Sequence, residues 1–479
     1  MPSLTVLLSL LAVAAYAFLC YLNGRLLAGL VTKSPEAVSL VCSPLLGGAA
    51  LGIELWLYGL VGIPWNPVTL VAPWVGAWAL ARRRLLEAVR ADLAMLRAVL
   101  EGIRDEDRLA LVLAAVTGLL VITYVLNLVT QPLTGFDAIS IWFFKAKFFY
   151  FTHSVDPGSI PGLGTHFPTD TGPFRVTAGL IRSLDYPPLF PLMVGSLYAM
   201  ISGVHDTLGK GVDVIFVLVG AAVVWAALSP YLGRGKAAIF AFLVTAVAAV
   251  QSGLGNPIYT GYVDYPLGIT MLASLANLQR ALIGGRRDTW VFAIVFAAVA
   301  ALLKSEGLPF LLAVGLVAAF KARRVLVSPA AVVALVLVVA WQAFATIHGW
   351  RSHHLLNDGI GDLPALLPAR GALIIAYAVK VTIERPDYHW LAAAFVLTVS
   401  LAYRQARRTA GAVLLLVALQ CTAYFAVLVL NPGELVGTFD RLVIQLAPAV
   451  VLLLGLAISS QPKEEPSVPS ALRVKLVGQ

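Results

Sequence analysis

Residues 109–151 read LALVLAAVTGLLVITYVLNLVTQPLTGFDAISIWFFKAKFFYF, and this stretch decides the fold class. Its first part, 109–130, contains no Asp, Glu, Lys or Arg and is long enough to cross the hydrocarbon core of a bilayer as a helix. The second part carries one acid, Asp137, and then a run rich in Trp, Phe and Tyr, which are typical of membrane–water interfaces. The stretch therefore predicts a transmembrane helix that emerges at a membrane surface and continues as an interfacial helix.

The composition of the whole chain also indicates a membrane protein. Of its 479 residues, 59% are hydrophobic and only 12% are charged, whereas a soluble domain carries about 25% charged residues. A chain this apolar must use lipid as part of its solvent. The net charge of +9 fits basic inner loops rather than a nucleic-acid partner. The three cysteines are widely spaced and form no CxxC, so neither a zinc site nor a disulfide framework is predicted.

The hydropathy pattern predicts an all-α polytopic membrane protein with about thirteen transmembrane helices. The predicted spans are 4–22, 38–63, 64–81, 109–130, 212–229, 236–252, 263–283, 289–303, 308–320, 329–347, 389–402, 411–431 and 441–458. One further apolar stretch, 186–204, is predicted to lie at the outer face without crossing. If it crossed, Arg234 and Lys236 would lie on the opposite side of the membrane from Arg82–Arg84, against the positive-inside rule.

The basic clusters divide the loops between two sides of the membrane. The inner side collects most of the Lys and Arg residues, many of them in 82–108, which is predicted to be an amphipathic surface helix. The long outer loops are 131–185, 253–262, 348–371 and 431–440. Because long loops in compact proteins are commonly functional, we expect the site of this multi-pass protein on the outer side of the membrane. The preference for Ala, Val and Leu, and for Arg over Lys, suggests a GC-rich bacterial genome, so we expect a bacterial inner (plasma) membrane with the site on its periplasmic or extracellular side.

Five outer motifs carry charged residues at one membrane depth. They are GFDAISIWFFKAK from Gly135, DYPPLFPL from Asp185, GYVDYPLG from Gly261, KSEGLPFLL from Lys304 and FDRLVIQLAP from Phe439. Each motif has a simpler structural explanation: Asp137 could be a helix N-cap, and Lys304 with Glu306 could form a salt-bridged corner. An interfacial Lys304 with only Glu306 nearby is costly unless it meets an anion, which favours a phosphate partner.

The order of these motifs, from about residue 109 to 458, resembles the GT-C membrane glycosyltransferases. These include bacterial aminoarabinose transferases of lipid A and protein O-mannosyltransferases. The resemblance implies a GT-C-like transmembrane core with extracytoplasmic juxtamembrane helices. On this basis we divide the chain into an N-terminal three-span extension with a cytoplasmic amphipathic helix (1–108), a catalytic core (109–458) and a disordered cytoplasmic tail (459–479).

The resemblance implies a polyprenyl-phosphate-sugar donor and an inverting transfer to a hydroxyl of an envelope glycan, glycolipid or protein. Asp137 matches the family's first-loop acid and would act as the general base, and Asp264 matches the second acid, which orients the acceptor or holds a metal. A lipid phosphate at the interface needs cations at that depth, and Lys145, Lys304 and Arg441 supply them. The expected substrate contacts are Asp185, Tyr186, Tyr262 and Glu306.

Two details of these assignments stay open. Metal use varies within the resembled superfamily, the chain has no DxD motif, and His353 and His354 are adjacent, which is poor spacing for one ion. No cofactor is firmly implied, and a divalent metal is left unassigned. Where relatives often carry His-Pro-Pro, this chain has Asp185 followed by Tyr-Pro-Pro. Lys145 and Lys147 point about 200° apart on a helix, so one is expected to face the site and the other to reach toward lipid headgroups.

Three other functions also fit an outer polar site. A transporter or flippase of a lipid-linked glycan would favour ionisable groups near the membrane midplane, and only Glu54 is clearly deep in a predicted span. A glycan ligase or polymerase would need a larger cleft. A non-catalytic assembly partner would bind the same lipid without releasing polyprenyl phosphate.

Overall fold

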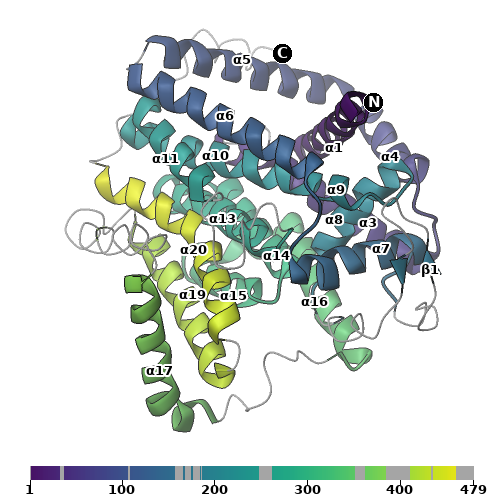
Figure 1. The fold of residues 1–479 in the computed structure, drawn as a ribbon. Coiled ribbons are helices and arrows are strands. Elements are labelled where there is room, and N and C mark those ends of the chain that lie inside the picture. The colour runs from purple at the N-terminus through teal and green to yellow at the C-terminus, as the bar shows by residue number, and fades with distance from the viewer. Residues whose placement is uncertain are drawn as a thin grey trace.

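The computed structural model describes residues 2–32, 37–105, 108–156, 166–167, 174–175, 184, 186–247, 261–350, 362–384, 397, 410–432 and 435–459. Within these ranges the protein is almost entirely helical (Figure 1). The strands described there are β1 (His166–Phe167) and β2 (Phe174–Arg175), a two-residue antiparallel pair in the predicted first outer loop. The predicted all-α class is confirmed.

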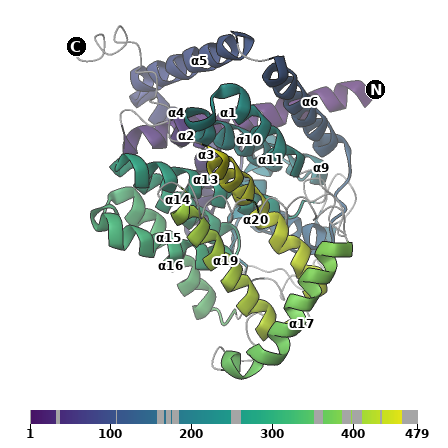
Figure 2. The same ribbon diagram turned by 90° about the vertical axis from the view of Figure 1, so that its left-hand side faces the viewer.

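The helices follow the predicted spans closely in most of the chain. In chain order they are α1 (Pro2–Val31), α2 (Ala37–Val41), α3 (Ser43–Val61), α4 (Pro67–Leu80), α5 (Arg82–Asp105), α6 (Arg108–Thr130), η1 (Ala138–Trp142), α7 (Phe143–Thr152), α8 (Leu189–Ile201), α9 (Asp206–Gly209), α10 (Gly211–Leu232), α11 (Arg234–Val247), α13 (Asp264–Gly284), α14 (Arg287–Leu303), α15 (Gly307–Ala322), η4 (Arg323–Val325), α16 (Pro329–Ile347), α17 (Leu363–Glu384), α19 (Gly411–Leu430) and α20 (Leu435–Ile458). The amphipathic helix expected over 82–108 is α5, which lies across one end of the molecule in both views (Figures 1 and 2).

Many of these helices are suited to a bilayer. Within the described residues, seven are long and apolar enough to cross one: Leu7–Val31, Ser43–Val61, Asp206–Leu232, Pro329–Ile347, Leu363–Glu384, Gly411–Leu430 and Arg441–Ile458. Shorter apolar helices cover Pro67–Leu80, Leu111–Asn127 and Leu189–Ile201. The protein is therefore a polytopic membrane protein, whereas the count of thirteen spans stays a prediction.

Helix α17 corrects the sequence interpretation. Its 22 residues, Leu363–Glu384, are long enough to span a bilayer, yet no span was predicted there and the loop 348–371 was expected to extend into its first turns. The hydropathy signal is interrupted by Pro368, Arg370 and Lys380, which explains the error. Arg370 finds a partner at close range, because its guanidinium donates to the carbonyl of Val429 at 3.1 Å. The predicted span 389–402 lies outside the described residues, except for position 397.

Helix α8 occupies the apolar stretch that was predicted not to cross. Its 13 residues extend about 20 Å at 1.5 Å per residue, which is shorter than the hydrocarbon core of about 30 Å. Its residues from Leu189 to Ala199 are all buried by protein. The length supports a non-crossing helix, and the sidedness itself stays a prediction.

The aromatic helix α7 is not the lipid-facing helix that the sequence suggested. Every residue from Phe143 to Phe149 is buried, so the aromatic side chains pack against protein on all sides. Ring contacts join it and the preceding turn to α8, as in the edge-to-face pair of Phe143 and Phe190 with centroids 6.2 Å apart. A hydropathy pattern cannot distinguish burial in lipid from burial in protein, which is why the error arose.

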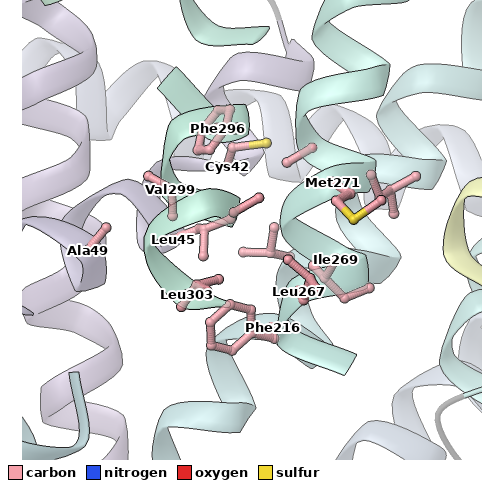
Figure 3. Close-up of a cluster of buried hydrophobic side chains, with 14 of the residues drawn as sticks. Cys42, Leu45, Ala49, Phe216, Leu267, Ile269, Met271, Phe296, Val299 and Leu303 are labelled. Carbon is pink, nitrogen blue, oxygen red and sulfur yellow. The ribbon is translucent and has the colours of Figure 1, made fainter. Parts of the chain in front are cut away.

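The core joins the N-terminal helices to the later ones. Cys42, Leu45 and Ala49 of the α2–α3 region meet side chains of α10, α13 and α14 in one apolar cluster (Figure 3). Helix α1 is tied to α8, because the Tyr16 hydroxyl donates to the Met193 carbonyl at 2.9 Å. Contacts therefore cross the boundary proposed at residue 108, and the division into an extension and a core stays a prediction.

Candidate functional site

Arg441 of α20 connects two acids that are far apart in the sequence. Its Nη1 lies 2.6 Å from Oδ2 of Asp137, which precedes η1. Its Nε lies 3.0 Å from Oδ2 of Asp264, the first residue of α13. One planar guanidinium therefore fixes the distance between the two predicted catalytic acids, as a fork of donors can do and a lysine cannot.

Lys304 extends this ion chain to a third acid. Its Nζ lies 2.8 Å from Oδ1 of Asp264 and 2.6 Å from Oε1 of Glu306. The premise that Lys304 has only Glu306 nearby is wrong, since the buried Asp264 is a second partner. The result is a continuous ion chain of Asp137, Arg441, Asp264, Lys304 and Glu306.

Gln445 is a further hydrogen-bond partner of the buried Asp264 carboxylate. The Gln445 amide donates to Oδ1 of Asp264 at 2.5 Å, and its own oxygen accepts a hydrogen bond from the Tyr424 hydroxyl of α19. This assignment fixes the orientation of the amide, because the oxygen faces a hydroxyl donor and the nitrogen faces a carboxylate. Tyr424 was not predicted as a site residue, because it lies in an apolar span with no motif around it.

The two acids on Arg441 differ in access. The Asp264 side chain is 1% exposed and both of its oxygens are engaged, whereas the Asp137 side chain is 18% exposed. Among the described residues none is recorded as bonding to Oδ1 of Asp137. Asp264 therefore pairs two cations in a buried position, and Asp137 is the more accessible of the two acids.

Helix ends and small residues explain why the ion chain forms here. Asp264 begins α13, where the helix dipole favours a negative charge, and Lys304 ends α14, where it favours a positive one. Gly307 begins α15 directly after this corner, and a Cβ there would lie 2.3 Å from the Ala300 carbonyl carbon. Only glycine allows so tight a turn between α14 and α15.

The α13–α20 contact depends on another glycine. A Cβ on Gly268, one turn after Asp264, would lie 2.7 Å from the backbone oxygen of Gln445. The absent side chain lets the two helices approach closely, as small residues do in membrane helix pairs. Arg441 and Gln445 reach Asp264 because of this approach.

Asp137 is oriented by its ion pair and not by capping. It precedes η1, and its side chain makes no capping hydrogen bond, so the N-cap explanation does not hold. The loop before it is held by Lys210, whose Nζ donates to the carbonyls of Gln131 and Pro132 at 2.6 and 3.2 Å. These carbonyls follow the end of α6, where a cation also complements the helix dipole. Lys210 was not predicted to have this role, because its two carbonyl partners lie nearly 80 residues earlier in the chain.

The two lysines of α7 are both buried. Lys145 is 1% exposed and donates to the Tyr186 carbonyl at 3.1 Å, and its Nζ lies 5.7 Å from the centre of the Tyr186 ring. Lys147 is 8% exposed and forms a 2.6 Å ion pair with Asp206. The expectation that one lysine reaches toward headgroups is wrong, because Asp206 supplies it with a buried partner.

Tyr262 lies on the face of the guanidinium. The ring centre is 5.2 Å from Cζ of Arg441, a cation–π geometry. Burial raises the pKa of the Tyr262 phenol, and the negative charge of Asp137 raises it further. Tyr262 is therefore a neutral phenol beside the ion chain at neutral pH.

Several predicted residues cannot be placed. Asp185, His353 and His354 lie outside the described residues, and nothing is described of the Asp440 side chain. Within the described part of the chain, no three His, Cys, Asp or Glu side chains are grouped as a metal site would require. The structure therefore brings together Asp137, Asp264, Lys304, Glu306, Arg441 and Tyr262, and it places Lys145 and Tyr186 in a neighbouring contact.

Comparison with known proteins gives two findings. The crystal structure of ArnT from Cupriavidus metallidurans bound to undecaprenyl phosphate is similar with 14% sequence identity and a TM-score of 0.45, over 77% of this chain and 62% of that one. No curated protein sequence gives a significant match. Residues 185–350 match the family model of the dolichyl-phosphate-mannose-protein mannosyltransferases. Over that stretch, which includes Asp264, Lys304 and Glu306, the chain is similar to these membrane glycosyltransferases, as its motifs predicted.

Proposed function

We propose that this protein transfers a sugar from a polyprenyl-phosphate-linked donor to an acceptor hydroxyl at the extracytoplasmic face of the membrane. The observation that carries the proposal is the ion chain, in which one arginine holds a partly exposed acid beside a buried one. The match of residues 185–350 to the family model of the dolichyl-phosphate-mannose-protein mannosyltransferases supports it as well. The donor class, the acceptor hydroxyl and inversion at the sugar are parts of this proposal.

Arg441 is the group best placed to bind the donor phosphate. Its Nε and Nη1 are engaged by carboxylates, and an arginine carries further donors on its remaining nitrogen. The ion chain holds three carboxylates against two cations, so an added phosphate would be repelled unless a carboxylate gives way. Asp137 is the more exposed of the two acids on Arg441. In our proposal the phosphate replaces it on the guanidinium.

This exchange would prepare the base. Once the phosphate holds Arg441, the Asp137 carboxylate loses its counterion and accepts a proton more readily. The acceptor oxygen forms a bond to the anomeric carbon on the face opposite the phosphate, and its proton passes to Asp137. The bond between the anomeric carbon and the phosphate oxygen breaks, and its electron pair leaves with the polyprenyl phosphate.

Asp264 and Lys304 would support this step without touching the reacting atoms. Lys304 is 2% exposed and bonds to two carboxylates, so we assign it to holding Asp264 rather than the phosphate. Asp264 in turn keeps Nε of Arg441 fixed while Nη1 changes partner. Lys145 stays the second predicted phosphate ligand, with Tyr186 beside it.

The direct test is release of the lipid product. Purified protein in lipid nanodiscs is incubated with a radiolabelled polyprenyl-phosphate-sugar, and free polyprenyl phosphate is measured with and without hydroxyl-bearing envelope extracts. A transferase releases polyprenyl phosphate and labels an acceptor. Replacing Arg441 by Gln should abolish both signals, and replacing the exposed Asp156 of the same outer region by Asn should leave them unchanged. Donor binding without any release would contradict transfer.

A lipid carrier is the second candidate, and one buried acid favours it. Asp213 of α10 is 2% exposed, and among the described residues neither of its carboxylate oxygens has a hydrogen-bond partner. Acids buried within membrane helices are frequent in transport pathways. Movement of a labelled polyprenyl-phosphate-sugar across a vesicle membrane, without release of polyprenyl phosphate, would identify a carrier.

A further inference from the structure

A second polar region lies at the far end of the α13–α14 hairpin. Asp264 begins the 21-residue helix α13, which ends at Gly284, about 30 Å away at 1.5 Å per residue. This distance matches the thickness of the hydrocarbon core. Residues that follow α13 therefore lie at the membrane surface opposite the ion chain.

Two adjoining hollows open at this end. The first, of about 460 Å³, is lined by Thr32, Asp288, Ser328 and the two arginines 286 and 287. The second, of about 630 Å³, is lined by Arg287, Trp290, Lys321, Arg323 and Arg324. Arg287 is common to both, so we call the pair the Arg287 hollows.

The first hollow has the features of an anion site. It contains the N-terminus of the 19-residue helix α16, where Pro329 has no N–H and the amide of Ala330 follows it at the positive end of the helix dipole. Ser328 is 4% exposed, and its hydroxyl has no hydrogen-bond partner among the described residues. A buried hydroxyl at a helix N-terminus without a partner indicates a missing acceptor. The Asp288 carboxylate repels an anion only weakly, because it accepts two hydrogen bonds from the Arg286 guanidinium.

The second hollow is lined by basic side chains that form no ion pair with the described residues. Four basic side chains line it, Arg287, Lys321, Arg323 and Arg324, and its lining includes no acid. No ion pair is recorded for any of the four within the described residues. Topology alone explains basic residues on this side. It does not explain why they surround a hollow beside an unsatisfied hydroxyl.

Exposed apolar residues beside the hollows identify the kind of ligand. Leu30 lines the first hollow and is 74% exposed, while Phe320 and Val327, which are 86% and 74% exposed, directly precede the lining residues Lys321 and Ser328 in the sequence. Such side chains face acyl chains in a membrane protein. A ligand that combines an anionic headgroup with a hydrocarbon tail would match both features.

We propose that the Arg287 hollows bind the headgroup of an anionic phospholipid from the membrane leaflet opposite the ion chain. The phosphate would accept from the Ser328 hydroxyl, the α16 amides and Arg287, and the acyl chains would lie on the exposed apolar side chains. Basic pockets between membrane helices recognise such headgroups by charge and hydrogen bonding. The site is separate from the proposed transfer reaction.

The test uses the full-length protein, purified in detergent and stripped of lipid. Native mass spectrometry would measure retention of phosphatidylglycerol against phosphatidylcholine, with inorganic phosphate as competitor. Arg287→Gln and Ser328→Ala should each lower phosphatidylglycerol retention about fivefold, because one basic side chain or one charged hydrogen bond contributes about that factor. Arg83→Gln is the matched control, since Arg83 is basic, exposed and on the same predicted side but outside the hollows.

Each outcome decides the proposal. Selective loss in the two hollow variants, with Arg83→Gln unchanged, supports a built headgroup site. Equal loss in all three variants would mean diffuse charge attraction and would overturn it, as would unchanged binding in the two hollow variants. Displacement of phosphatidylglycerol by millimolar inorganic phosphate would show that the hollows recognise a free anion, which also contradicts a lipid site.

Discussion

At the scale of single residues, the proposed chemistry depends on the contrast between the buried Asp264 and the more exposed Asp137. A carboxylate that is 1% exposed and bonded to Lys304, Arg441 and Gln445 cannot reach a substrate without breaking buried contacts. Removing one partner of a buried ion pair is costly, because the other charge then stays buried without a counterion. In the proposed reaction Asp264 therefore acts mainly by holding Lys304, Arg441 and Gln445 in position.

Lys304→Met tests this structural role. The substitution leaves Asp264 without its shorter ion-pair contact, and breaking a buried pair costs roughly 3–5 kcal/mol. We expect a clearly lower Tm in detergent by thermal unfolding. Lys380→Met on α17 removes a 65% exposed lysine and should leave the Tm unchanged. An unchanged Tm in Lys304→Met with weakened donor binding would instead restore the phosphate role that the sequence suggested.

At the scale of elements, the approach of α20 to α13 sets the geometry of the site. Arg441 and Gln445 are one turn apart on α20, and both bond to the acid that begins α13. The two helices can approach this closely because Gly268 has no side chain. A small outward displacement of α20 would separate Arg441 from Asp264 while leaving both helices intact.

Gly268→Ala measures how much the approach matters. The added Cβ would lie 2.7 Å from the Gln445 oxygen, so the two helices must separate. We expect turnover to fall at least about tenfold, because displacements near 1 Å from productive geometry are costly. Gly315→Ala in α15 is the matched control, since nothing lies within 4 Å of its added Cβ. Full activity in Gly268→Ala would show that the reaction does not depend on the α13–α20 distance.

Part of the site followed from the sequence and part of it did not. Asp137, Asp264, Lys304 and Arg441 stand out because charged residues at the ends of apolar runs are conspicuous. Their pairing could not be predicted, because Arg441 and Asp137 are 304 residues apart and no local pattern relates them. The burial of α7 was also missed, since an aromatic helix has the same composition in lipid and in protein.

At the scale of the whole molecule, α17 changes how the spans are counted. The positive-inside rule places three basic residues on the inner side: Arg404, Arg407 and Arg408. If α17 crosses the membrane, they stay on that side only when 389–402 does not cross as well. The total then stays at thirteen, and Arg385 moves from the outer to the inner side. This arrangement fits the positive-inside rule better, because one more basic residue, Arg385, then lies on the inner side.

Cysteine labelling at the two ends of α17 tests the crossing. In a background without Cys20, Cys42 and Cys421, Asp362→Cys should react with an impermeant thiol reagent added outside, and Glu384→Cys should react only after the membrane is permeabilised. Reaction of both positions from outside would place α17 along the outer surface and keep the original set of spans.

The same method tests the short helix α8. Because its 13 residues are too few to cross, cysteines at Asp185 and His205 should both be labelled from outside. Labelling of only one position would mean that the segment crosses. The loops that carry Asp264 and Arg441 would then lie on the opposite side of the membrane from Asp137, against the ion pair between Arg441 and Asp137.

The central claim is that the Asp137 carboxylate accepts the acceptor's proton after the donor phosphate has displaced it from Arg441. Asp137→Asn keeps the size of the side chain but removes the proton acceptor and the competing charge on the guanidinium. The measurement is donor binding and single-turnover transfer in the same preparation, with Asp156→Asn as the control. We predict donor affinity equal to or tighter than that of the unmodified protein, and transfer at least about a hundredfold slower. Near-normal transfer in Asp137→Asn would contradict the account.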